Sequence, residues 1–182
     1  TDPGKRHFVM KQPVGVTACI APWNFPLMLW ARKVAPALAA GCTVVSRSAS
    51  QTTLSVLQTL KYIERCELPA GVLNHVTGPA GELADEFLSN PICRKVTFTG
   101  STEVGRTLLE RSATNITNVS LELGGQAPAV VCNDADIDVA VDRVFGAKFR
   151  NGGRSCIAIN RIYVQSGMYD EFVDRFIEKV RG

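Results

Sequence analysis

The sequence predicts an α/β fold in which a parallel β-sheet carries helices on both faces. Runs rich in Val, Ile and Thr alternate with segments of helical apolar spacing almost from end to end of the 182 residues. Glycine and proline separate these runs, as they do at connections between strands and helices. No internal repeat or low-complexity tract interrupts the alternation.

The predicted strands are short apolar or β-branched runs. The first, VGVTACIA at 14–21, ends at Pro22, and Pro22 and Pro26 hold the following PWNFP turn rigid. The other predicted strands lie at 43–46, 72–76, 95–99, 119–123, 129–132 and 161–164.

The predicted helices follow from apolar spacing and from signals at their ends. Gly41 is expected to cap the carboxyl end of the first helix, and Ser101 to cap the amino end of a later one. The acidic residues Asp134 and Asp136 suit the amino end of another. The predicted helices span 27–40, 51–66, 78–89, 101–114, 137–150 and 168–182.

Composition excludes several classes of protein. The net charge of +3, with no long Lys/Arg run, does not favour nucleic acid. The longest apolar runs are broken well short of a bilayer span, so no membrane partner is expected. Residues 1–10 contain no apolar stretch of the kind a secretory signal carries, and the sequence does not begin with Met.

The six cysteines do not form a metal or disulfide pattern. None is paired as C-x-x-C, and with only two histidines we expect no metal site. Five of them are expected to be buried free thiols of a protein from a reducing compartment. These five are Cys19, Cys42, Cys66, Cys93 and Cys132.

The sixth cysteine, Cys156, lies in the segment RNGGRSCIAINR at 150–161. Two glycines and several polar residues predict a loop in which the backbone can approach a ligand closely. A thiol delivered by such a loop is a candidate nucleophile.

Other turns at predicted strand ends hold further candidates, because ligands bind at the carboxyl ends of parallel strands. Asn24, in the rigid PWNFP turn, could supply an oxyanion donor, although Asn beside Pro is also a common turn former. Glu122, flanked by leucines, suits a buried general base with a raised pKa, although an edge strand explains it equally.

Two more turns have the character of a dinucleotide site. Gly100 and Ser101 join a strand to a helix whose free N–H groups suit a phosphate, although an ordinary capped helix has the same sequence. Arg47, after the strand at 43–46, could hold a ribose or its 2′-phosphate, with a solvated loop as the alternative.

Beyond these separate signals, the sequence resembles the NAD(P)-dependent aldehyde dehydrogenases over essentially its whole length. The resemblance rests on APWNFP, ALAAGCTVV, PAGVLNHVTG, KVTFTGSTEVGR, VSLELGGQAP and KFRNGGRSC, in that order. Among the subfamilies it is most similar to the succinate-semialdehyde dehydrogenases. The implied fold is a Rossmann-like cofactor domain over 1–123, incomplete at its amino end, and the first part of a catalytic domain over 124–182.

The resemblance also implies residue roles. Cys156 corresponds to the nucleophile, Glu122 to the general base and Asn24 to the oxyanion donor. The implied reaction oxidises an aldehyde, succinate semialdehyde in the nearest subfamily, through a thioester. The positions expected along NADP or NAD are Trp23, Arg47, Ser50, Gly78, Gly100, Ser101 and Leu123.

Several positions depart from the family pattern. Arg47 stands in place of the usual Lys, and Ser50 where NAD-preferring members often have Glu. A Glu would repel a 2′-phosphate, so the pair Arg47 and Ser50 favours NADP. Arg154 replaces a more common Gln and could act on the thiol or on an anionic substrate. Ala158 replaces the second Cys of many relatives, which excludes a local disulfide with Cys156.

Two alternative hypotheses remain at this point. One is a truncated, non-catalytic protein that at most binds nucleotide, because segments that flank this region in the family have no counterpart here. The other is a cysteine-dependent esterase, because a thiol, a base and an oxyanion donor suffice for acyl transfer. The resemblance further implies a cytoplasmic or mitochondrial-matrix location and a homo-oligomer for the full-length protein.

Overall fold

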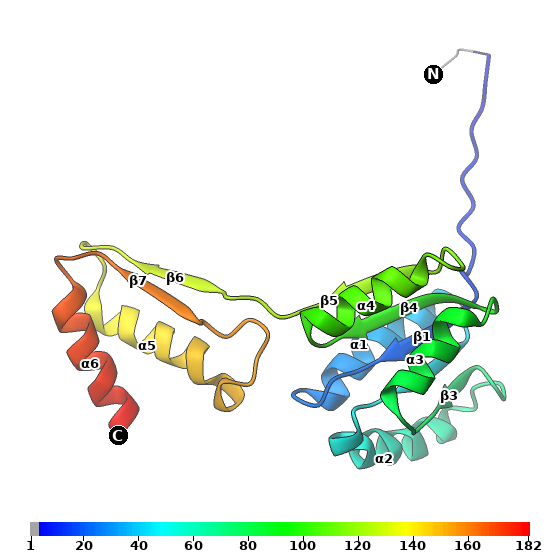
Figure 1. The fold of residues 1–182 in the computed structure, drawn as a ribbon, viewed down its shortest axis with the longest axis horizontal. Coiled ribbons are helices and arrows are strands. Elements are labelled where there is room, and N and C mark those ends of the chain that lie inside the picture. Colours follow the sequence, from blue (N-terminus) through cyan, green and yellow to red (C-terminus); the bar gives the residue numbers. More distant parts are fainter. Residues whose placement is uncertain (1–3) are drawn as a thin grey trace. The chain divides into compact units, whose positions relative to one another are not determined.

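The computed structural model describes residues 4–182, so residues 1–3 of the first predicted domain lie outside the described part. The chain forms two compact units, the first ending at Glu122 and the second running from Leu123 to Gly182. Each unit has its own parallel sheet (Figure 1). The predicted α/β fold with a parallel sheet and helices is confirmed.

The sheet of the first unit has five parallel strands in the order β3-β2-β1-β4-β5. The chain builds from β1 outward to β2 and β3, then returns across the sheet to add β4 and β5 on the other side of β1. The order therefore reverses between β1 and β4, the kind of switch point where α/β sheets bind ligands. The strands are β1 (Val16–Ile20), β2 (Val44–Arg47), β3 (Leu73–His75), β4 (Cys93–Thr99) and β5 (Asn118–Glu122).

Helices cover both faces of this sheet. Successive residues of a strand point to opposite faces. Cys19 packs with the helices that follow β1 and β2, whereas its neighbour Ala18 lies beside Phe87 of the helix that follows β3. The helices are α1 (Pro26–Ala39), α2 (Thr53–Ile63), α3 (Ala80–Ser89) and α4 (Thr102–Ser112).

The predicted helix at 51–66 is not one continuous α-helix. A 3₁₀ turn, η1 (Ser50–Thr52), precedes α2, and a second, η2 (Glu64–Cys66), follows it. Glu67 then adopts a left-handed conformation with φ of 52°, which ends the helical segment.

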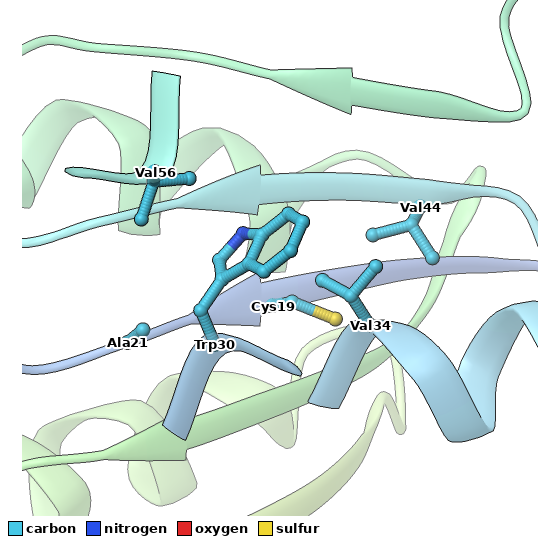
Figure 2. Packing of buried hydrophobic residues seen from close by; sticks show 6 residues of the cluster. All are labelled: Cys19, Ala21, Trp30, Val34, Val44 and Val56. Carbon is cyan, nitrogen blue, oxygen red and sulfur yellow. The ribbon is translucent and has the colours of Figure 1, made fainter. Parts of the chain in front are cut away.

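The core between α1, α2 and the sheet is centred on Trp30. Figure 2 shows the indole of Trp30 above the strands, surrounded by Cys19, Val34, Val44 and Val56. Trp30 is 3% exposed, and Val44 and Val56 are fully buried. Burial of an aromatic side chain among branched aliphatic ones is the main force that holds α1 and α2 on β1 and β2.

The second unit is a single β-α-β crossover with one added helix (Figure 1). Strands β6 (Pro128–Val131) and β7 (Arg161–Val164) pair in parallel, and α5 (Ile137–Phe149) connects them through the 3₁₀ turn η3 (Arg150–Gly153). Helix α6 (Tyr169–Arg181) packs on α5. The core of this unit contains Val131, Val141, Val144, Met168 and Phe172.

The prediction that five cysteines are buried is wrong for two of them. All six are free thiols, but Cys66 ends the turn η2 and Cys132 follows β6, and both are exposed. Cys19, Cys42 and Cys93 are buried as predicted. A residue at or just after the end of an element can be exposed even when its sequence neighbours are apolar, because the chain turns toward solvent there.

Alkylation with iodoacetamide at mildly alkaline pH should distinguish these two groups of thiols. We expect Cys66 and Cys132 to react in the folded protein, because the thiolate is the nucleophile and both are exposed. Burial raises the pKa of Cys19 to about 12, so this thiol should react only after unfolding. Peptide mass spectrometry with and without denaturant measures the difference, and rapid native labelling of Cys19 would contradict the burial.

Candidate active site

The predicted site residues of the first unit gather at one edge of its sheet. Each predicted turn follows the carboxyl end of a different parallel strand, so all of them open on the same side of the sheet. Trp23 and Asn24 follow β1, Arg47 ends β2, Gly78 follows β3, Gly100 and Ser101 follow β4, and Glu122 ends β5.

Asn24 lies in a tight bend between β1 and α1. The backbone N–H of Ala21 donates to the carbonyl of Arg47 at 2.9 Å, which ties the end of β1 to β2 before the bend begins. Pro26 opens α1, where the missing N–H of proline costs nothing. Asn24 is half-buried and Trp23 is exposed. The carboxamide is therefore carried by a short segment held at both ends.

Gly100 is required by the close approach of a neighbouring ring. A Cβ atom at this position would lie 2.2 Å from Cζ of Phe98, and Phe98 is itself buried in β4. The N–H of Gly100 donates to the carbonyl of Glu122 at 3.1 Å. The turn after β4 is thus fixed to the end of β5.

Ser101 caps α4 as predicted. Its Oγ accepts a hydrogen bond from the N–H of Val104 at 3.3 Å. In the same first turn, a backbone N–H and then the Ser101 hydroxyl lower the pKa of Glu103. The amino end of α4 therefore stabilises negative charge in this molecule, as a phosphate site requires.

Glu122 is exposed, so the prediction of a buried carboxylate is wrong. It pairs in register with Thr99 of β4 and is the last residue of β5, which forms one edge of the sheet. Side chains alternate between the two faces of a strand, so Glu122 points away from the face of the half-buried Leu121 and is exposed at the end of this edge strand.

Arg47 is the last residue of β2 and is half-buried, so the alternative of a solvated loop does not hold. Its Nε is buried and has no hydrogen-bond partner among residues 4–182, and burial lowers the pKa of the guanidinium. The next residue, Ser48, is only 4% exposed. Ser50 is exposed and begins η1. A buried donor without a partner is unfavourable, so this Nε is available to an anionic or oxygen-bearing ligand.

Lys33 of α1 is a functional candidate that the sequence-based interpretation missed. Its side chain is 7% exposed, and Nζ donates to Oγ1 of Thr99 at 2.6 Å. Burial lowers the pKa of this ammonium, whereas the nearby groups of Cys19 and Glu122 oppose that shift. A cation thus lies beneath the end of β4, within electrostatic reach of Glu122. The sequence signal was a lysine three residues after Trp30, on the apolar side of the helix.

His75 was also missed. It is the last residue of β3, and its ring nitrogens lie 2.9 Å from Oγ of Ser46 and 3.2 Å from Oγ of Ser48. Burial, and then the positive charge of Arg47, lower the pKa of His75. This network lies within electrostatic reach of the half-buried Arg47 described above.

Cys156 lies in the second unit, in the turn that follows a run of left-handed backbone. Asn151, Gly152 and Gly153 have φ of 53°, 64° and 76°, a run that only glycine and asparagine adopt readily. The turn closes where the N–H of Ala158 donates to the carbonyl of Ser155 at 3.1 Å. The thiol of Cys156 is exposed between these two residues, while Ala158 is buried.

Arg154, two residues before the thiol, folds back on the same turn. Its Nε donates to the carbonyl of Asn151 at 3.0 Å, and a Cβ on Gly152 would lie 3.2 Å from its guanidinium. Gly152 therefore leaves room for the arginine beside the backbone. Leu123, the remaining predicted cofactor position, is the first residue of the second unit and is half-buried.

Two classes of feature are not found in the described part of the chain. Among residues 4–182, no helix combines the length and apolar character that crossing a bilayer requires. Over the same residues, no three His, Cys, Asp or Glu side chains are grouped so that they could hold a metal ion.

Comparison with known proteins gives consistent matches. The model of the aldehyde dehydrogenase family matches residues 1–182. The glutarate-semialdehyde dehydrogenase of Pseudomonas aeruginosa is 56% identical over 95% of the chain. The NADP(+) succinate-semialdehyde dehydrogenase GabD of Escherichia coli is 53% identical over 97%. The chain spans about 36% of the length of each of these two relatives.

Solved structures agree with these matches. A crystal structure of an NADP-dependent enzyme of E. coli superposes with a TM-score of 0.91 and 52% identity, over 93% of this chain and 35% of that one. The succinate-semialdehyde dehydrogenase of Burkholderia pseudomallei gives a TM-score of 0.92 and 46% identity, over 94% of this chain and 36% of that one.

Substitution of Gly100 by alanine should test the close packing at the end of β4. The new methyl group overlaps the ring of Phe98, so we expect the free energy of unfolding to fall by about 1–3 kcal/mol. Gly81 of α3 has no atom within 4 Å of its Cβ position, so Gly81→Ala is the matched control. It should raise stability by up to about 1 kcal/mol. Urea denaturation measures both, and equal stabilities would contradict the overlap.

Proposed function

The chain belongs to the aldehyde dehydrogenase family, and on that premise we propose that it oxidises a short aldehyde with a terminal carboxylate, succinate semialdehyde first, using NADP⁺. The observation that carries the proposal is the common sheet edge of Asn24, Arg47, Ser101 and Glu122. The names of two similar proteins, a glutarate-semialdehyde and a succinate-semialdehyde dehydrogenase, support the choice of substrate class.

The residues at the sheet edge fit a dinucleotide phosphate. The amino end of α4 already lowers the pKa of a carboxyl in its first turn, so it favours an anion. Gly100 fixes the turn before α4, because it packs against the ring of Phe98 and its N–H donates to the carbonyl of Glu122 at 3.1 Å. The buried Nε of Arg47 lacks a partner within residues 4–182. Trp23, Gly78, Ser50 and Leu123 complete the proposed cofactor surface.

NADP⁺, when bound, supplies the hydride acceptor of the reaction. We propose that Arg47 and Ser50 hold its 2′-phosphate, because a guanidinium and a small hydroxyl attract an anion whereas a carboxylate at position 50 would repel it. Relatives and solved structures include an NADP(+) enzyme and a betaine aldehyde dehydrogenase with bound NAD⁺, so the family contains both preferences.

In the proposed mechanism, Cys156 attacks the carbonyl carbon of the aldehyde as a thiolate. The oxygen that becomes negative is stabilised by the carboxamide of Asn24 and the backbone N–H of Cys156. Loss of hydride leaves a thioester on the sulfur. Glu122 then removes a proton from water, which attacks the thioester and releases the carboxylic acid.

Arg154 suits a substrate with its own carboxylate, because it places a cation on the turn that carries the thiol. The partners we propose are therefore small aldehydes rather than nucleic acid or membranes. We also propose a reducing location and self-association of the natural protein. The plant relative from Arabidopsis thaliana is named mitochondrial, and the bacterial ones carry no such label.

Loss of the thiol should abolish NADPH formation from succinate semialdehyde. In the full natural protein we expect Cys156→Ala to lower kcat by about 1000-fold or more, because no other group forms the thioester. Cys132→Ala removes another exposed thiol of the same unit and should leave the rate unchanged. Equal rates for wild type and Cys156→Ala would refute the mechanism.

Substitution of the proposed base Glu122 should distinguish the dehydrogenase from the two alternative hypotheses, a non-catalytic nucleotide-binding protein and an esterase. Glu122→Gln should slow turnover by about 100-fold, the usual contribution of a general base, while nucleotide binding persists. A protein that binds nucleotide but forms no NADPH is the non-catalytic alternative. Ester hydrolysis without any cofactor is the outcome expected of an esterase.

Removal of the guanidinium should change the choice of cofactor. Arg47→Gln should weaken NADP binding about 10- to 100-fold, the value of a charge-assisted hydrogen bond, and change NAD binding little. Lys61→Gln, which removes an exposed cation of α2, serves as the control. Kinetic titration with both cofactors measures the ratio. Wild-type turnover with NAD at least equal to that with NADP would contradict the preference.

A further inference from the structure

We propose that His75 is a positioning residue that sets the choice between NADP and NAD by holding Ser48, and with it the segment from Arg47 to Ser50, in place. This inference rests on the proposed function, in which Arg47 and Ser50 meet the 2′-phosphate. His75 itself makes no proposed contact with cofactor or substrate.

The position of His75 follows from the pairing of the two outer strands. β2 and β3 run in parallel with Ser46 opposite His75. The N–H of Val76 donates to the carbonyl of Ser46 at 2.9 Å, so the backbone ladder is intact at this pair. The imidazole therefore leaves β3 directly beside the end of β2, where the chain turns toward Arg47 and Ser48.

The two ring nitrogens have different partners. Ser46 donates its hydroxyl proton to the carbonyl of Asn74 at 3.1 Å, so its Oγ accepts from Nδ1–H of His75 at 2.9 Å. Because burial and the charge of Arg47 lower the pKa of His75, the imidazole is neutral near pH 7 and Nε2 carries no proton. Nε2 lies 3.2 Å from Oγ of Ser48 and accepts the one hydroxyl proton of Ser48 when this proton turns away from Oγ1 of Thr53, the other acceptor at 3.2 Å.

Ser48 has a buried hydroxyl that neighbouring side chains hold. It is the first residue beyond β2, and its hydroxyl bonds to Nε2 of His75 and to Oγ1 of Thr53. The Thr53 hydroxyl is itself engaged with the carbonyl of Ala49 at 3.1 Å. The imidazole thus anchors a buried hydroxyl at the middle of the segment that carries Arg47 and Ser50.

This arrangement makes cofactor choice sensitive to one hydrogen bond. Arg47, which is half-buried and has a buried Nε, precedes Ser48, and the exposed Ser50 follows Ser48 by two residues. A shift of Ser48 would move Arg47 and Ser50 relative to the 2′-phosphate of the bound cofactor. Contacts to the 2′-phosphate would weaken, whereas contacts to the pyrophosphate at α4 would remain, so the effect falls on NADP more than on NAD.

Two variants separate the contacts of the ring. In His75→Asn the amide nitrogen stands in for Nδ1 and keeps the bond to Ser46, but nothing reaches Ser48. In His75→Gln the longer side chain places an amide oxygen near the position of Nε2, where it accepts from Ser48. The strand pairing of β2 and β3 does not depend on either change, because it rests on backbone bonds.

The probes are adenosine 2′,5′-bisphosphate and AMP, bound to the full natural protein and followed by calorimetry. We expect His75→Asn to lose about 3- to 10-fold in affinity for the bisphosphate, the value of one neutral hydrogen bond, with AMP binding unchanged. His75→Gln should retain most of the wild-type preference. Thermal unfolding of each variant identifies any loss of fold.

The outcomes distinguish this inference from the function on which it rests. Wild-type protein that binds neither probe would contradict the nucleotide site itself. Wild-type preference for the bisphosphate that persists in both variants would overturn the role of His75 alone. Equal loss of both probes in both variants, or loss in His75→Gln but not in His75→Asn, would assign His75 a structural role and also overturn the inference.

Discussion

The burial of β1 on both faces is the constraint on which the first unit depends. Thr17 to Ala21 are at most 7% exposed, and β1 pairs in parallel with β2 on one side and β4 on the other. A strand of this kind requires helices above and below it, and crossover connections that leave it in two directions. The reversal of strand order beside β1 then brings turns from opposite halves of the unit to one edge. The candidate site is a consequence of this topology.

Several polar side chains are buried at the carboxyl edge of the first sheet, next to the candidate site. Lys33, Ser46, Ser48 and Thr99 are all buried there. Lys33 and Thr99 satisfy each other, and His75 joins the two serines. Buried polar groups with partners hold fixed directions, which is the preorganisation that binding and catalysis require. Arg47 differs, because its Nε has no partner within the described residues, and this is the feature that favours an additional ligand.

In the second unit, backbone geometry rather than a buried network presents Cys156, the proposed nucleophile. Three successive left-handed residues bend the chain after α5, and the following turn exposes Cys156. Glycine makes the bend inexpensive, and the arginine folded against Gly152 fills the space that a side chain would occupy. A thiol on such a turn can be approached by substrate, whereas Cys19, with a pKa raised to about 12 by burial, cannot serve.

Local patterns and short motifs were enough to predict the order of strands and helices, the cap at Ser101, the glycine turns and the family. They failed where distant residues decide the environment. Glu122 proved exposed although leucines flank it, and Cys66 and Cys132 proved exposed because one ends the turn η2 and the other follows β6. The contacts of Lys33 and His75 appeared only in the tertiary structure. Lys33 donates to Thr99, which is 66 positions away in the sequence. His75 is bonded to Ser48, which is 27 positions away. Local sequence sets which element forms, but hydrogen bonds across a parallel sheet join residues that no short pattern connects.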